Sequence, residues 1–562
     1  MSKLQLLSPR KWFPAALCAA VSAFGAPAAF ATGSANPSSC HSSCPDPHGH
    51  APACTSWVAG DFHQHTTYTD GANPFETVMY YNDYFGLDWW ANSEHGGAFP
   101  RDAFGPILQE KFDTAQYARF WDDTDAYDPS PLAGDPAGSS SGHLNMWRWQ
   151  SLSEHSFNNV LLARRLFHKP IVQGVEWNVP GHEHCSVGII AGEFGESPNA
   201  DAIASFEYLW DANDKDTSLG PKNLVNNHAK AVAAVAWLQA NHPRTSWTVY
   251  SHVERKGPGD PTYVGSGSRG YDIADFRDLN NAGPDVAFGF ESMPGHQKES
   301  GRGGYGSNSI GGGTFGGCGA YAAKVGYLWD ALLGEGRPWW LFASSDFHNT
   351  GGDFWPGEYQ KTHTCVRNPR DPQAIVDGLR SGNGFVTEGD LIDGLEFSVS
   401  VTPGRGSATL GETLHAQSGR KVQVTVRFHS PERNNNGDTV AVDHVDVISG
   451  RITGYVQPGD ADYNNPVNPT AHVLRRLTPG DWRTDRSGWK TACFEIRAKE
   501  SFYLRLRGTN NAINNAAEVD ASVSAYNGQV NYDPALDPAG NTAADAWKDL
   551  WFYSNAIFVE VK

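Results

Sequence analysis

Two short segments of the chain combine histidine and carboxylate side chains at a spacing that suits a metal ion. His63-Gln-His65 directly follows an apolar, strand-like run, and Asp70 lies a few residues beyond it. Asp346-Phe-His348 follows another such run much later in the chain. In an extended chain, residues i and i+2 point to the same side. Each pair therefore has the geometry to hold one cation.

Similar side chains stand at the ends of further strand-like runs. His95, Glu176 and His252 end or closely follow apolar runs, and His184 comes shortly after Glu176. A single His-x-His pair is more often a pair of partly buried polar groups. Recurrence at several strand ends instead favours a metal centre, because the carboxyl ends of parallel strands collect active-site residues at one face.

Two of these positions have a competing histidine nearby. His182 and His184 share the segment Gly-His-Glu-His, and His184 is preferred because a strand-like Cys-Ser-Val-Gly-Ile-Ile follows it. His242 ends an expected helix and competes with His252, which directly follows an apolar strand. Strand-end placement favours His252. The sequence leaves both alternatives open.

The elements expected to position these side chains alternate between strands and helices, as in β/α units around a parallel sheet. Asn73-Pro74, with Glu76, predicts the start of one helix, and Asp371 followed by proline predicts the start of another. A helix is also expected over residues 226–241, and residues 101–168 form an expected insertion. The expected strands are residues 56–62, 87–93, 171–176, 246–250, 286–290 and 338–344.

After about residue 391 the pattern changes to strict alternation of apolar and polar residues. Leu395-Glu-Phe-Ser-Val-Ser-Val is one such run, and Lys421-Val-Gln-Val-Thr-Val is another. This alternation predicts an antiparallel β-sandwich over residues 392–562, following an α/β region over residues 55–391. The β part contains four of the 21 histidines, and its sequence shows no group of residues that suggests catalysis or metal binding.

The composition of the 562-residue chain excludes several classes of protein. A content of 40% hydrophobic and 12% aromatic residues is too high for a disordered chain. The formal net charge of −19 argues against a broad surface for nucleic-acid polymers. Beyond the N-terminus, no segment is long and apolar enough to predict a transmembrane helix.

Residues 1–31 have the layout of a secretory signal peptide. A basic start with Lys3, Arg10 and Lys11 precedes an Ala-rich apolar stretch, and Ala29-Phe-Ala31 is a small-x-small cleavage site. Its removal takes away three positive charges and changes the net charge from −19 to −22. We therefore expect an exported protein, periplasmic or extracellular, in which disulfides are possible. Residues 32–54 are an expected Cys/His/Pro-rich linker.

The strand-end motifs resemble those of the PHP (polymerase and histidinol phosphatase) superfamily of metal-dependent phosphoesterases. The resemblance covers about residues 55–392. It rests on the Asp-x-His-x-His-Thr opening with a downstream Asp-Gly, a Glu-His pair, a Gly-Val-Glu and a Ser-Asp-x-His close. The chain looks most like secreted bacterial members with a trailing β domain. The implied α/β fold is a distorted (β/α)7 barrel holding two or three divalent ions, followed by an all-β sandwich-like domain.

The resemblance also implies three groups of ligands, with Glu176 bridging the first two. The first group is His63, His65, Glu176 and Asp346, the second is Glu176, His184 and His252, and the third is Asp70, His95 and His348.

Mixed histidine and carboxylate ligands suit zinc, manganese or iron. Closely spaced ions lower the pKa of bound water, so the expected reaction is hydrolysis by metal-bound hydroxide. Three dications with three carboxylates leave roughly +3, which attracts a small anionic substrate such as a phosphate ester. Arg255, Lys256 and His296 are candidate contacts to that substrate. The alternatives are an ester, amide or carbamate hydrolase with the same centre, and a non-catalytic glycan- or surface-binding protein.

Overall fold

The computed structural model describes most of the chain after the expected linker. The described residues are 55–100, 137–140, 143–190, 198–255, 270–298, 302–304, 314–404, 406–512 and 543–562. The expected signal peptide, the linker, residues 101–136 of the expected insertion and Lys256 lie outside them. Among the described helices, none combines the length and the apolar character needed to cross a membrane.

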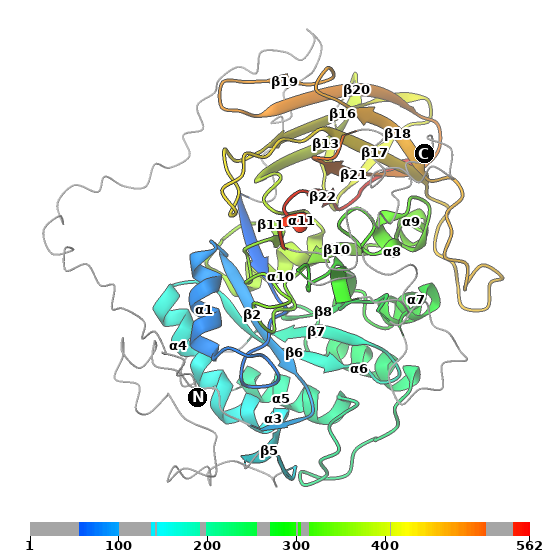
Figure 1. Ribbon diagram of the computed structural model, residues 1–562. Helices are drawn as coiled ribbons and strands as arrows, with labels where there is room; N and C mark the ends of the chain where they lie inside the picture. Colours follow the sequence, from blue (N-terminus) through cyan, green and yellow to red (C-terminus); the bar gives the residue numbers. More distant parts are fainter. Residues whose placement is uncertain are drawn as a thin grey trace, which may run out of the picture. The chain divides into compact units, whose positions relative to one another are not determined.

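The α/β region is built on a large mixed sheet (Figure 1). Its strand order begins β10-β9-β8-β7-β6-β2-β1-β11-β12. The strands are β1 (Ser56–Asp61), β2 (Trp89–His95), β6 (Ile171–Asn178), β7 (His184–Ile189), β8 (Ser246–Tyr250), β9 (Ala287–Met293), β10 (Trp340–Ala343), β11 (Gln360–Val366) and β12 (Gly384–Glu388). The six strands expected in this region are therefore all present, with small shifts at their ends.

The directions of the strands depart from the expected parallel sheet. The pairs β1–β2, β2–β6, β8–β9 and β9–β10 are parallel. Strand β7 runs antiparallel to both β6 and β8, and β11 runs antiparallel to β1 and β12. The reason for the β7 reversal is local, because only residues 179–183 separate β6 from β7 and so short a segment permits a hairpin but no parallel crossover.

Strands β1 and β10 are far apart in this strand order, but the chain segments that follow them lie side by side. Gln64 and Phe347 form an isolated parallel bridge. The amide of His65 donates to the carbonyl of Phe347 at 2.8 Å, and the amide of Ser345 donates to Asp61 Oδ2 at 2.7 Å. The two His/Asp segments of the sequence are thereby brought side by side.

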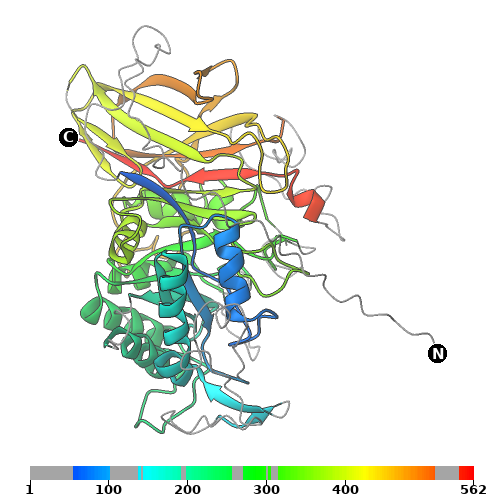
Figure 2. The same ribbon diagram turned by 90° about the vertical axis from the view of Figure 1, so that its left-hand side faces the viewer.

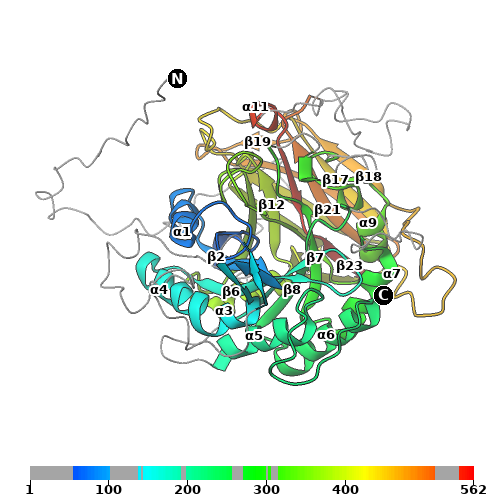
Figure 3. The same ribbon diagram turned by 60° about the horizontal axis from the view of Figure 1, so that its bottom comes forward.

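Helices pack along the outside of these strands (Figure 3). The longer ones are α1 (Phe75–Tyr84), α4 (Phe157–Phe167), α5 (Pro198–Trp210), α6 (His228–Asn241), α7 (Ile273–Ala282), α9 (Leu328–Gly334) and α10 (Pro372–Ser381). Short helical segments are α3 (Arg148–Ser151), η1 (Leu152–Ser156), η2 (Arg302–Gly304), α8 (Ala320–Ala323) and α11 (Ala543–Ala546). Helices α1 and α4 lie next to each other (Figure 2) and share an apolar cluster with β2.

Both expected helix starts are present, but only one has the expected side-chain cap. The side chain of Asp371 accepts from the amide of Gln373 at 2.9 Å, which confirms the expected cap of α10. Helix α1 begins at Phe75 after Pro74, without a side-chain cap. Asn73 is instead held in the preceding loop, where its carbonyl accepts from the amide of Thr67 at 3.0 Å.

Tryptophan side chains make up a large part of the buried core. Trp89, Trp177 and Trp247 are fully buried. Gly188 leaves room for Trp247, because a Cβ at this glycine would lie 2.2 Å from the indole ring. Burial of apolar surface stabilises by roughly 25 cal/mol per Å². This packed core holds the strand ends in fixed positions.

The C-terminal region consists of two sheets with a shared apolar core. One has the order β14-β13-β16-β20-β19, and the other continues the large sheet as β12-β22-β21-β17-β18. The expected alternation of burial is seen along β13, whereas Gln423 and Thr425 of β16 are buried like the valines between them, and β15 and β23 pair in parallel. The strands are β13 (Gly394–Thr402), β14 (Ser407–Thr409), β15 (Thr413–Ala416), β16 (Arg420–His429), β17 (His444–Arg451), β18 (His472–Leu477), β19 (Arg483–Thr484), β20 (Lys490–Ala498), β21 (Phe502–Thr509), β22 (Trp551–Ser554) and β23 (Ile557–Val561). A small separate sheet holds β3 (Ala98–Pro100), β4 (Ser139–Ser140) and β5 (His143–Trp147).

Candidate metal centre

The nine residues predicted as ligands converge on one side of the large sheet. His63 and His65 follow β1, His95 ends β2, Glu176 lies in β6, His184 begins β7, His252 follows β8, and Asp346 and His348 follow β10. The remaining residue, Asp70, lies in the loop between β1 and α1. Eight of the nine therefore lie in or next to a strand, although His184 stands at the start of its strand and Asp70 lies in a loop.

Glu176 lies at the middle of the group. Its Oε1 is 3.1 Å from His63 Nε2, 2.7 Å from His184 Nδ1 and 3.1 Å from His252 Nε2. Its Oε2 is 3.2 Å from His65 Nε2 and 2.7 Å from His95 Nδ1. One carboxylate thus contacts five imidazoles, which is the position required of a residue that bridges ions.

Asp346, which follows β10, contacts two of these histidines, His63 and His65. Its Oδ1 lies 3.1 Å from His63 Nε2 and 3.3 Å from His65 Nε2. One ligand atom from each of His63, His65, Glu176 and Asp346 lies within 4.8 Å of the others. These four are the residues of the first implied group.

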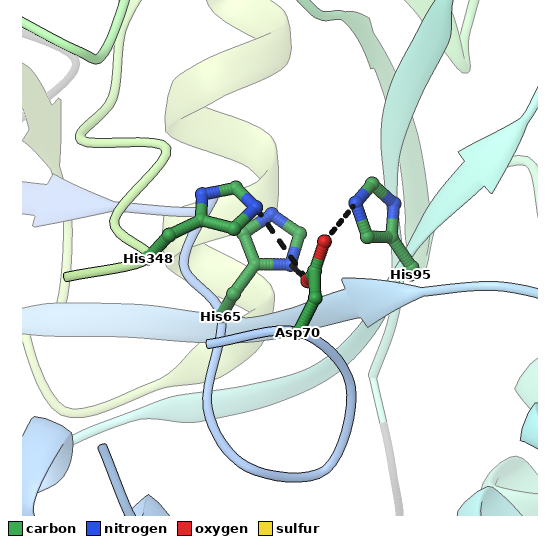
Figure 4. Close-up of side chains that lie close together, drawn as sticks. All are labelled: His65, Asp70, His95 and His348. Atoms are coloured by element: carbon green, nitrogen blue, oxygen red, sulfur yellow. Dashed lines mark ion pairs between the residues drawn. The ribbon is translucent and has the colours of Figure 1, made fainter. Parts of the chain in front are cut away.

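Asp70 joins the three histidines at the outer edge (Figure 4). Its Oδ1 lies 3.5 Å from His348 Nε2 and 3.5 Å from His65 Nδ1, and its Oδ2 lies 3.3 Å from His95 Nε2. The side chain of Asp70 is 44% exposed, whereas His65 is fully buried. This part of the group therefore faces solvent.

Several buried atoms of the group have no hydrogen-bond partner among the described residues. They are His63 Nε2, both ring nitrogens of His65, Nδ1 of His95 and of His184, Glu176 Oε2 and Asp346 Oδ1. Buried polar atoms are normally hydrogen-bonded. Imidazole nitrogens and carboxylate oxygens that converge without hydrogen bonds are the atoms that coordinate borderline divalent ions. The residues therefore fit a metal centre.

The electrostatics of the group favour bound positive charge. Burial raises the pKa of Glu176, but the surrounding imidazoles outweigh it and hold the pKa well below the usual value. Burial lowers the pKa of His63, but Asp346, Glu291 and Glu176 outweigh it and hold the pKa well above the usual value. The carboxylates are thus ionised at neutral pH. Metal binding must displace ring protons, so metal affinity rises with pH.

Backbone strain also concentrates here. His252, His296 and Asp346 have φ of 32°, 55° and 45°, in the left-handed region that side-chain-bearing residues rarely adopt. Each follows the end of a strand that leads into the centre. Such conformations cost about 1–3 kcal/mol and persist where the surrounding structure imposes them, commonly at functional sites.

Carboxylates beyond the centre hold its histidines, and the sequence analysis missed them. Glu291 Oε1 lies 3.0 Å from His63 Nδ1, and Glu183 Oε2 lies 3.2 Å from His252 Nδ1. A carboxylate on the far nitrogen fixes the tautomer and orientation of a metal-binding histidine. Glu291 follows an expected apolar strand, so the strand-end signal used for the other residues could have found it.

Two of the three candidate substrate contacts lie beside Asp346. His296 Nε2 is 2.9 Å and Arg255 Nη2 is 3.2 Å from Asp346 Oδ2. His296 Nδ1 also lies 2.6 Å from Asp353 Oδ1. Burial lowers the pKa of His296, but Asp346 and Asp353 outweigh it and raise the pKa to about 10. His296 is therefore cationic at neutral pH.

Comparison with solved structures gives a structural likeness. No family model matches the chain, and no curated protein matches it. A solved two-domain protein from Bacteroides vulgatus, containing a predicted PHP-like metal-dependent phosphoesterase, is similar to this chain with a TM-score of 0.31. The two are 12% identical over 83% of this chain and 94% of that one.

The two competing histidines lie elsewhere. His182 groups with His228 and Asp275. His242 ends α6 and therefore stands before β8, whereas His252 stands after it. Geometry thus brings His184 and His252 next to Glu176, as preferred from the sequence.

Proposed function

We propose that the protein is an exported metal-dependent hydrolase and that its substrate is a phosphate ester. One observation carries the proposal: Glu176 is surrounded by five imidazoles, with the carboxylates of Asp346 and Asp70 completing the donor set. No ordinary structural role requires so many buried ligand atoms at one point.

The proposed centre holds two or three ions of zinc, manganese or iron. His63, His65, Glu176 and Asp346 would hold one, Glu176, His184 and His252 a second, and Asp70, His95 and His348 a third. Such ions lower the pKa of a coordinated water and polarise a phosphoryl oxygen.

The proposed roles of the surrounding residues follow from their charge. Arg255, with a side chain 26% exposed, presents a guanidinium at the edge of the centre, where it suits a phosphate oxygen. Both ring nitrogens of His296 face carboxylates, those of Asp346 and Asp353. That position suits a donor to the leaving group. Lys256, outside the described residues, stays a prediction.

We further propose that the α/β region is a PHP-like (β/α)7 barrel. Seven strands, β1, β2 and β6 to β10, carry the centre, and the bridge between Gln64 and Phe347 joins their two ends. These two features support a closed arrangement.

Export is supported by cysteine chemistry as well as by the expected signal peptide. Cys365 and Cys493 are disulfide-bonded, whereas Cys185 and Cys318 are buried thiols. Disulfides form and persist in oxidising compartments. An exported protein is expected to keep these bonds, and thiol counting on protein purified from the periplasm or medium measures them.

The function is tested with a substrate panel. Purified mature protein is assayed on phosphate monoesters and diesters, carboxyl esters and amides, each with Mn²⁺, Zn²⁺ or Fe²⁺. We expect turnover of phosphate esters above the others. Preference for carboxyl esters or amides would indicate the alternative hydrolase. Absence of turnover by metal-loaded protein would contradict an enzymatic function and favour a binding protein.

The role of the centre is tested by Asp346→Ala. We expect a loss of bound metal and a fall in kcat/KM of more than about 100-fold. Removing a residue that only orients a metal ligand costs about 10–100-fold, and removal of a ligand itself is expected to cost more. Asp377→Ala is the matched control, because its side chain is 50% exposed on α10. Circular dichroism checks that both variants are folded. Full activity in Asp346→Ala would contradict the proposed centre.

A further inference from the structure

A second group of histidine and carboxylate side chains lies outside the proposed centre. His182 precedes β7, His228 is the first residue of α6, and Asp275 is in the first turn of α7. One ligand atom from each lies within 4.8 Å of the other two. His182 and Asp275 are 1% and 3% exposed, and the side chain of His228 is 26% exposed. The group is therefore largely buried but reachable from solvent.

The outer nitrogen of each ring faces an acceptor. His182 Nδ1 lies 3.3 Å from the carbonyl oxygen of Gly270. His228 Nε2 lies 3.3 Å from Asp278 Oδ2. A carbonyl or carboxylate oxygen only accepts, so these outer nitrogens carry the hydrogens. In neutral imidazoles the inner nitrogens then carry lone pairs.

The two inner nitrogens face each other. His182 Nε2 lies 2.8 Å from His228 Nδ1. Asp275 Oδ1 lies 3.4 Å from His228 Nδ1 and 3.8 Å from His182 Nε2. Two lone pairs and a carboxylate oxygen that converge in this way repel one another unless a proton or a metal ion lies between them.

Asp275 is oriented toward this point by its own helix. Its Oδ2 accepts from the amide of Asp272 at 2.9 Å, and its amide donates to Asp272 Oδ1 at 3.0 Å. This reciprocal cap satisfies Oδ2 and turns Oδ1 toward the histidines. Asp278 is similarly held, because its Oδ1 accepts from the hydroxyl of Tyr463 at 2.5 Å.

We propose that His182, His228 and Asp275 form a further site for a divalent metal ion, and specifically for zinc. Two imidazole nitrogens and one carboxylate oxygen match the ligand chemistry of zinc, with solvent able to complete the coordination. The acceptors on the outer nitrogens supply the orientation that metal-binding histidines require. The site does not depend on the proposed hydrolase activity.

The site joins three elements near the proposed centre. Gly181, with φ of 83°, lets the turn before β7 approach α6 so closely that a Cβ would lie 3.0 Å from the amide nitrogen of His228. Tyr271 stacks on His182 at a centroid distance of 4.7 Å and donates to the carbonyl of Glu183 at 2.7 Å. A bound ion would therefore stabilise the turn that carries Glu183 and His184.

The test counts zinc on the full mature chain. Protein freed of metal with a chelator is equilibrated with Zn²⁺, separated from free ion, and analysed for zinc per chain. Wild type is compared with His228→Ala and with His242→Ala, a matched control at the other end of α6. His228→Gln provides a second variant that keeps a polar side chain in case the alanine variant does not fold.

We expect both His228 variants to bind one zinc fewer per chain than wild type and His242→Ala. We also expect zinc to raise the Tm of the metal-depleted wild type more than that of the His228 variants. A single zinc per wild-type chain that is lost in His228→Ala would support this site while contradicting the proposed catalytic centre. Equal zinc content in all four proteins would overturn the proposal, and the two rings would then share a proton.

Discussion

At the scale of single residues, the site depends on how each imidazole is oriented. Glu291 is fully buried, and its carboxylate lies 3.0 and 3.1 Å from Nδ1 of His63. The hydroxyls of Ser186 and Ser251 donate to the same carboxylate at 3.4 Å. With Nδ1 committed to Glu291, the Nε2 atom of His63 is directed at Glu176 and Asp346. Glu291 is thus a positioning residue.

We therefore expect Glu291→Gln to weaken metal binding by about 10–100-fold, because a neutral amide orients His63 less firmly and lowers its basicity. Chelator competition measures the affinity, and activity is expected to recover partly at high metal concentration. Glu500→Gln, whose parent side chain is 52% exposed, is the control. Unchanged affinity in Glu291→Gln would show that the carboxylate has no positioning role.

At the scale of elements, strand β11 carries a buried histidine between the α/β region and the C-terminal strands. The ring of His363 stacks on Phe385 of β12 at a centroid distance of 4.4 Å, and Nε2 lies 3.1 Å from Thr387 Oγ1. Burial, with a smaller contribution from Lys361, lowers the pKa of His363 to about 3. The ring is therefore neutral in the folded protein at neutral pH.

This pKa predicts how stability changes with pH. The unfolded chain binds a proton at His363 below pH of about 6.5, whereas the folded chain does so only near pH 3. The resulting stability is present above pH of about 6.5 and is lost as pH falls toward 3, by on the order of 5 kcal/mol at most. We expect His363→Gln to reduce this dependence in urea unfolding, and the exposed His415→Gln to leave it unchanged. The same pH dependence in His363→Gln and wild type would contradict the prediction.

Strand positions were predictable from the sequence because alternation and apolar runs are local properties. The expected strand over residues 246–250 coincides with β8. The reversal of β7 was not predicted, although its cause, the short segment of residues 179–183 between β6 and β7, is itself local. Similarly, Asn73 has the residue type of a helix cap, but α1 begins at Phe75 after Pro74 and has no side-chain cap.

At the scale of the whole molecule, the α/β region and the C-terminal region share one sheet. Strand β12 pairs with β22 near the end of the chain, and β22 pairs with β21. Asp330 of α9 accepts from Arg505 Nε and Nη2 of β21, both at 2.8 Å, and from the hydroxyl of Tyr503 at 2.9 Å. Both partners of this ion pair are fully buried.

We therefore expect residues 55–391 produced alone to be insoluble or partly unfolded. Deletion would leave β12 without β22 and Asp330 without Arg505, and loss of one partner of a buried ion pair costs about 3–5 kcal/mol. The complete mature chain is expected to unfold in a single transition, which calorimetry measures. Co-expression with residues 392–562 is the control and should restore soluble protein. A stable, monomeric 55–391 fragment would contradict this view of the molecule.

The sequence by itself determined which residue types stand at the strand ends, and therefore the class of chemistry that we propose, because residue type and strand pattern are local signals. It indicated nine residues, and the structure brings all nine into one group. Only the tertiary structure decided which member of the His182/His184 pair lies beside Glu176, and that the other faces His228 and Asp275. It also decided that Glu291 supports His63. The contacts of His182 with His228 and of Glu291 with His63 join side chains more than 40 residues apart in the sequence, and periodicity carries no information about such contacts.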